Sequence, residues 1–140
     1  MKFVTWENVG VDRIGCAWLI RRFVNKKAEF VFIPEGSTTI PPGAEPFDIP
    51  GVKLSHHHGH CSFHALLREY KLMDDLVLKR IARIIDEADT VQEASLEEAA
   101  PGLDMICSGI RLASPNDDAA LERGAMVYDA LYAALKQEAA

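Results

Sequence analysis

Histidine is concentrated in one short part of this chain. All five histidines lie within the nine positions from His56 to His64, and Cys61 lies among them. Neutral imidazole binds zinc, iron, copper or nickel through one ring nitrogen, so neighbouring histidines can together supply two or more metal ligands. A cysteine close to histidines and to a helix N-terminus can instead have a lowered pKa and act as a nucleophile or redox group. A solvated loop that binds metal only adventitiously is the third interpretation, and residue types alone do not choose among the three.

The histidines differ in how well they are placed to bind one metal ion together. His56 and His57 are the predicted nitrogen ligands. Adjacent side chains on an extended segment point in opposite directions, so His58 and His60 are expected to be bystanders. His64 comes two residues into a predicted helix, and we expect it at the surface or at the helix cap.

A metal site also needs donors from elsewhere, and the sequence DEAD, Asp86–Asp89, provides carboxylates where a predicted helix ends. Glu87 and Asp89 are the predicted oxygen ligands. They are two positions apart, so they converge only if the helix terminates at Ala88. Acidic residues here oppose the helix dipole by roughly 0.3–1 kcal/mol each; this hints at function, although an exposed polar face explains them without one. Nitrogen plus carboxylate ligands favour iron, manganese or zinc, whereas ligation by Cys61 would shift the preference toward zinc or copper.

The N-terminal third predicts a strand, a helix and a second strand. The strands are Lys2–Trp6 and Glu29–Ile33, and the helix is Val11–Val24, with Asp12 as its N-cap. In a unit of this kind the strands are parallel, and ligands bind at the carboxyl ends of the strands. Asp12 is therefore expected to be a metal ligand or to orient an imidazole, and Arg13 to bind an oxyanion or a carboxylate bidentately.

The second half of the sequence is mainly helical, and it follows a connection rich in proline and glycine. A stretch rich in alanine, with Pro101 and Gly102 inside it, predicts two short helices instead of one. Ser114 is the expected cap of the last helix, which is the longest. The predicted fold class is α/β and rich in helix, with a small sheet. The connection and the helical segments are 34–51, 62–70, 74–89, 95–113 and the chain from 114 onward.

Composition limits the classes of function. With 140 residues, of which 49% are hydrophobic, the chain is expected to form a single domain, 1–140. Its net charge of −6 argues against direct binding of nucleic acid. An apolar run of roughly 20 residues, as a membrane span requires, is not present, and the N-terminus lacks a secretory signal; we expect a cytoplasmic protein, with a homodimer as a candidate assembly. Cys16 and Cys107, in apolar helical segments, are expected to fill the core.

Four stretches of the chain resemble the C-terminal domain of the bacterial chromate-resistance protein ChrB. The resemblance implies a role in chromate resistance or its sensing, and both a regulatory and a superoxide-dismutating role are associated with such proteins. Regulators of this family carry an additional N-terminal domain. The residues that match the family's motifs by position are Asp12, Arg13 and Cys16, then His56 and Cys61, and finally Glu87 and Asp89. The stretches that carry the resemblance are Val11–Pro34, Pro46–Phe63, Ile81–Thr90 and Ala120–Leu135.

Two hypotheses follow for the function. In the first, the domain depends on an iron, manganese or zinc ion bound by His56, His57, Glu87 and Asp89, and it performs redox chemistry or metal-assisted hydrolysis. In the second, binding of a metal ion, or of chromate or another small oxyanion, shifts a conformation that a partner senses, without turnover. The first predicts a redox-active or water-exchanging metal, and the second predicts reversible binding alone.

Overall fold

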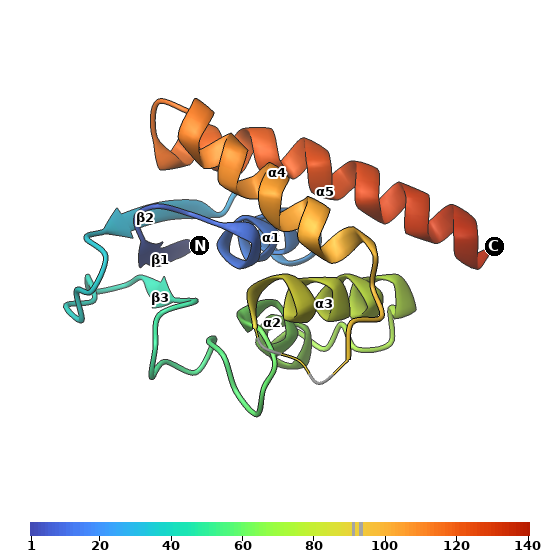
Figure 1. The fold of residues 1–140 in the computed structure, drawn as a ribbon. Coiled ribbons are helices and arrows are strands. Elements are labelled where there is room, and N and C mark those ends of the chain that lie inside the picture. The colour runs from blue at the N-terminus through green and yellow to red at the C-terminus, as the bar shows by residue number, and fades with distance from the viewer. Residues whose placement is uncertain (91, 93) are drawn as a thin grey trace.

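A small parallel sheet lies at one end of the molecule. The computed structural model describes residues 1–90, 92 and 94–140. The sheet has the strand order β2-β1-β3 (Figure 1). Its strands are β1 (Lys2–Trp6), β2 (Glu29–Ile33) and β3 (Glu45–Pro46). Both pairings are parallel, with Lys2 opposite Glu29 in the first. The predicted parallel strands are therefore confirmed, and β3 is a short strand inside the segment that we expected to be only a connection.

The crossover between β1 and β2 is helical, as predicted. Helix α1 (Val11–Leu19) continues as one π-helical stretch, Ile20–Val24, before β2. The prediction that Asp12 caps this helix is wrong, because the N-cap is Gly10, which offers no side chain. Asp12 lies inside the first turn and is buried. Its carboxylate accepts hydrogen bonds from backbone amides of another helix.

The second half forms α2 (Ser62–Glu69), α3 (Leu76–Asp89), α4 (Ala99–Ala113) and α5 (Asp117–Ala139). The predicted break in α4 is wrong: Pro101 lies in its first turn, where a helix needs no hydrogen bond from the residue's nitrogen. The prediction of Ser114 as cap of α5 is also wrong, since the Asn116 side chain accepts from the Ala119 amide, 2.8 Å away.

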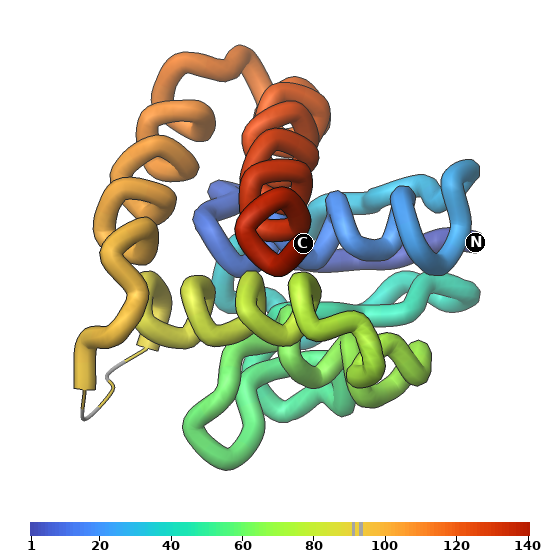
Figure 2. Tube along the Cα trace, turned by 90° about the vertical axis from the view of Figure 1, so that its right-hand side faces the viewer, coloured from blue at the N-terminus to red at the C-terminus, as the bar shows by residue number. Residues whose placement is uncertain are grey.

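Helix α1 lies at the centre of the molecule. It packs against α2, α3, α4 and α5, and Figure 1 shows α4 and α5 on one side of it and α2 and α3 on the other. Figure 2 shows α4 and α5 side by side, with α3 crossing beneath them. Trp18 of α1 stacks on Phe63 of α2 and Tyr128 of α5, which joins these layers through aromatic contacts. The fold is α/β and rich in helix, as predicted.

Within residues 1–90, 92 and 94–140, no helix combines the length and the apolar character that a bilayer crossing requires.

Candidate metal centre

Three side chains from distant parts of the chain meet in one cluster. His56 Nε2 lies 3.0 Å from Asp12 Oδ2 and 3.2 Å from Asp89 Oδ2. One ligand atom from each residue lies within 4.8 Å of the other two. Asp12 comes from the first turn of α1 and Asp89 from the last residue of α3, while His56 comes from the segment that precedes α2. The cluster offers one imidazole nitrogen and carboxylate oxygens, the donor types that iron, manganese and zinc accept.

Asp12 is held in place by burial and by hydrogen bonds to both of its carboxylate oxygens. Its side chain is only 2% exposed, yet both of its oxygens accept hydrogen bonds. Oδ2 accepts from the Ser62 amide at 2.8 Å and Oδ1 from the Phe63 amide at 3.0 Å. These amides belong to the first turn of α2, where a helix lacks internal partners for its N–H groups. Asp12 therefore caps α2 from a different helix, which explains both its burial and its rigid position.

Asp48 is a third acidic residue of the site, and the sequence analysis did not identify it. Its Oδ1 lies 3.6 Å from His56 Nε2 and accepts a hydrogen bond from the Ser62 hydroxyl. Its φ of +52° is in the left-handed region, which is uncommon for residues other than glycine. The sequence signal that could have identified Asp48 is a lone carboxylate between two apolar residues, Phe47 and Ile49. The structure shows that both of these apolar residues are fully or almost fully buried. Asp48 follows β3 as Asp12 follows β1, so adjacent parallel strands deliver both carboxylates to one edge.

Arg13 lies in the wall of the same site, although it already has a carboxylate partner. Its Nε lies 3.0 Å from Asp48 Oδ2, and its Nη2 donates to the Asp48 carbonyl at 3.2 Å. The guanidinium also lies over the Trp6 ring, 5.6 Å from its centre. Arg13, Asp12, His56 and Asp89 line a cavity of about 610 Å³. The structure thus places Arg13 where we expected it, and an anion there would compete with Asp48.

The electrostatics of the site show an excess of negative charge. The hydrogen bond that His56 donates to Asp12, together with the charges of the nearby carboxylates, raises the pKa of His56 to about 9 despite partial burial. Burial and the charge of Asp12 raise the pKa of Asp48 to about 7, although Arg13 opposes the shift. Burial and Asp12 also raise the pKa of Asp89. Each shift favours one more positive charge among these carboxylates, which a proton or a metal ion can supply.

Two of the predicted metal ligands lie elsewhere. Helix α3 continues through Asp89, so Glu87 and Asp89 do not converge, because residues two apart in a helix point in different directions. Glu87 instead accepts hydrogen bonds from the amides of Leu96 and Glu97, at 3.1 and 2.9 Å, ahead of α4. The exposed His57 places its Nε2 2.9 Å from the Lys53 carbonyl oxygen. The structure does not bring Glu87 or His57 into the cluster.

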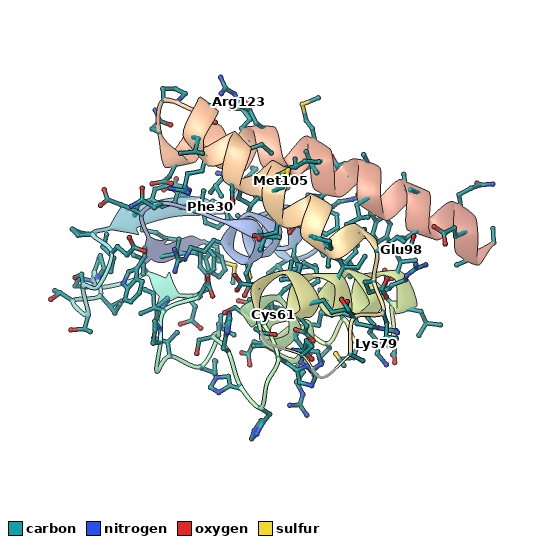
Figure 3. The ribbon with its side chains drawn as sticks, in the orientation of Figure 1. Phe30, Cys61, Lys79, Glu98, Met105 and Arg123 are labelled. Carbon is teal, nitrogen blue, oxygen red and sulfur yellow. The ribbon has the colours of Figure 1, made fainter. Side chains whose placement is uncertain are left out.

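The two cysteines predicted at the site are buried thiols. Cys16 Sγ donates to Asp12 Oδ1 at 3.4 Å, and Cys61 Sγ donates to the Ala82 carbonyl at 3.5 Å. Both residues have no exposed surface, and Figure 3 shows Cys61 at the start of α2, beside α3. Burial, with the nearby charge of Asp12, raises the pKa of both thiols well above the ordinary value. The alternative in which Cys61 has a lowered pKa is not supported, because the thiol is buried and the charged groups nearest to it include the carboxylates of Asp12 and Asp86.

Protonation of His56 should stabilise the metal-free protein. Its pKa rises from 6.5 to about 9 on folding, so its stabilising effect is complete below pH 6.5 and is lost as the pH rises through about 9. We expect the free energy of unfolding to fall between pH 6.5 and about pH 10 more steeply in the wild type than in His56→Gln. Denaturant unfolding with a chelator present measures this difference. Equal pH dependence in the two proteins would show that the Asp12 contact does not hold the proton.

The fold and the site define a helix-rich α/β domain with a histidine and carboxylates gathered at the carboxyl ends of parallel strands. The chain belongs to the family described as ChrB, C-terminal domain, whose model matches residues 3–135. Protein ChrB of Cupriavidus metallidurans is 36% identical over 131 residues, which are 94% of this chain and 40% of that protein. The chain thus spans well under half of that relative. No solved structure matches the chain.

Proposed function

We propose that this domain binds one divalent transition-metal ion, iron, manganese or zinc, through Asp12, His56 and Asp89. The observation that carries the proposal is the approach of one imidazole nitrogen and two carboxylates within 4.8 Å, beside a cavity of about 610 Å³. A site with three protein ligands that opens into a cavity leaves coordination positions for a small molecule, as catalytic sites do.

The residues present suit a cation. Asp12, Asp48 and Asp89 bring three carboxylates, and Arg13 is paired with one of them. A divalent ion balances the remaining charge better than the single proton that His56 holds. Asp12 is held by the amides of α2, so little ordering is needed before it binds metal. When bound, the ion would supply Lewis acidity or, for iron and manganese, one-electron chemistry.

The ligand that we propose for the cavity is a small oxyanion such as chromate. Membership of the ChrB family links the chain to chromate resistance by name. Arg13 and the metal ligands line the same cavity, and guanidinium groups bind oxyanions through two parallel hydrogen bonds. In this proposal, Arg13 holds the anion and the ligand residues hold the ion, while the neighbouring apolar side chains limit the access of water.

A second candidate function is a sensor without turnover, and the Arg13–Asp48 pair favours it. An anion that binds Arg13 has to compete with Asp48, whose backbone is in the left-handed region and lies in the connection between β3 and α2. Loss of the pair would free that connection to move. An assay of superoxide loss detects turnover, and an assay of chromate binding detects binding without turnover. The two assays together therefore separate an enzyme from a sensor.

The metal site itself is tested by replacing its ligands in protein purified without a tag. We expect His56→Ala and Asp89→Asn each to lose one equivalent of zinc or manganese in calorimetric titrations. The control is His58→Asn, which removes an imidazole from the same loop. Asparagine suits this position because it tolerates the φ of +53° found there. If the control loses the same equivalent, or if neither ligand variant changes metal uptake, the proposal is wrong.

A further inference from the structure

A second group of imidazoles lies outside the proposed centre. His57, His58, His60 and His64 line a separate cavity of about 340 Å³, which also borders Cys61 at the start of α2. None of these histidines belongs to the Asp12–His56–Asp89 cluster among the residues that the structure describes. The segment that holds the first three precedes α2 and projects from the molecule below that helix (Figure 1), while His64 lies in α2 itself.

A tight turn sets the positions of two of these histidines. His57 and His60 pair as an antiparallel bridge, with amide-to-carbonyl bonds of 3.2 and 2.9 Å in the two directions. The two residues between them have φ of +53° at His58 and +78° at Gly59, as a type I′ turn requires. Directly opposed residues of such a pair project from the same face. The turn therefore presents the imidazoles of His57 and His60 together.

Hydrogen bonds select one nitrogen on each of these rings. His60 Nδ1 lies 2.9 Å from Oδ2 of the buried Asp86, a carboxylate that also accepts from the Cys61 amide at 2.7 Å. His57 Nε2 lies 2.9 Å from the Lys53 carbonyl oxygen, which can only accept. The bonded nitrogen of each ring therefore carries a proton, and in the neutral imidazole the other nitrogen has the lone pair that a metal ion binds. Metal-binding histidines are oriented in this way, by a carboxylate or carbonyl on the second nitrogen.

A third imidazole comes from α2. The His64 ring lies 4.1 Å from the His60 ring, centre to centre, and the two planes differ by 13°. His64 is half-buried and lies in the first turn of α2, so the helix fixes its backbone. A metal ion lies in the plane of each ring that binds it, so two stacked rings cannot both bind one ion. The His64 side chain therefore has to rotate out of the stack before it shares an ion with His60. Lys53 at the cavity rim is paired with Glu69, 3.0 Å away.

We propose that His60 Nε2, His64 and His57 Nδ1 bind a second divalent cation, and that Cu(II) binds there most tightly. Three nitrogen donors without a carboxylate ligand favour ions that prefer imidazole, and Cu(II) is at the top of the affinity order for such sites. The last turn of α3 supports both sites, since Asp86 orients His60 and Asp89 contacts His56. The inference uses different ligands from the proposed function and does not depend on it.

The experiment is a Cu(II) titration of the full, tag-free chain, followed by electron paramagnetic resonance. The signal reports how many nitrogens bind the ion. The variants are His60→Gln and His64→Gln for this site, Asp89→Asn for the other site, and His58→Asn as the matched control. Circular dichroism spectra that match the wild type establish that each variant folds. We expect His60→Gln and His64→Gln each to lower the affinity of this site for Cu(II) about tenfold or more. Each variant should also remove nitrogen couplings from the resonance signal.

The outcomes separate the two sites. We expect Asp89→Asn and His58→Asn to keep the nitrogen-rich Cu(II) signal. If His58→Asn weakens binding as much as His64→Gln, the loop binds Cu(II) adventitiously and the inference is wrong. It is also wrong if neither glutamine variant changes the signal. If the wild type binds a single ion that His64→Gln removes and Asp89→Asn does not, the proposed function fails while this inference stands.

Discussion

Asp12→Ala should lower the free energy of unfolding of the metal-free protein by about 2–6 kcal/mol. The change removes the acceptor of the Ser62 and Phe63 amides, both of which are in buried hydrogen bonds. An unsatisfied buried donor costs roughly 1–3 kcal/mol, and two donors lose their partner together. Helix α2 would lose its cap and His56 its nearest carboxylate. Denaturant unfolding followed by circular dichroism measures the loss.

Two further variants give this prediction its controls. Asp12→Asn keeps one oxygen acceptor, so we expect about half of the loss. Asp74→Ala removes an exposed carboxylate, and we expect a change within about 0.5 kcal/mol. A loss below about 1 kcal/mol in Asp12→Ala would contradict the cap, because water would then be satisfying the two amides.

Gly124→Ala should lower the free energy of unfolding by about 1–3 kcal/mol, even though alanine is the better helix former. Gly124 is buried in α5 where this helix crosses α1, and a Cβ there would overlap the Cγ2 methyl of Ile14. That methyl branches at Cβ, so rotation of the far end of the side chain does not relieve the overlap. The helices would have to separate, which loosens the aromatic contacts between α1 and α5.

Gly109→Ala is the matched control for this prediction. Gly109 is in α4, and a Cβ there meets open space. We expect a gain of about 0.5–1 kcal/mol from helix propensity. The two alanine substitutions are therefore predicted to have opposite signs in parallel unfolding experiments. Equal stabilisation by both would contradict the close packing of α5 on α1.

Local sequence patterns predicted the parts of the fold that they control. The β1–α1–β2 unit was predicted because its strands are rich in apolar, aromatic and β-branched residues and the segment between them offered a capping residue for a helix, although the structure shows that Asp12 is not that cap. The break at Pro101 was wrong because sequence alone did not show that helix α4 begins at Ala99, which leaves proline in the tolerated first turn. The strand β3 is two residues long, too short to give a pattern of its own.

The site was predicted only in part, because its geometry depends on contacts across the chain. His56, Asp89 and Asp12 were identified from residue type and expected position, and the structure brings them together. Glu87 was included because the end of α3 was uncertain by one residue. Asp48 was missed because its role comes from the pairing of β3 with β1, which places a loop carboxylate beside Arg13.

The arrangement of Asp86 and Asp89 illustrates the same limit. Both lie in the last turn of α3, three positions apart, and so they share a face of the helix. Asp86 contacts His60 while Asp89 contacts His56. The sequence shows the spacing, but which histidine each carboxylate meets depends on the turn between His57 and His60, which packs against α3 only in the folded protein.

Anomalous X-ray diffraction from crystals of the tag-free chain, grown with zinc or manganese, tests the central claim most directly. We predict a peak about 2.0–2.2 Å from His56 Nε2 and from carboxylate oxygens of Asp12 and Asp89. Crystals of Asp89→Asn should lack this peak under the same conditions. A fully metal-loaded crystal with its anomalous peaks elsewhere, and with His56 still hydrogen-bonded to Asp12, would contradict the proposed metal centre.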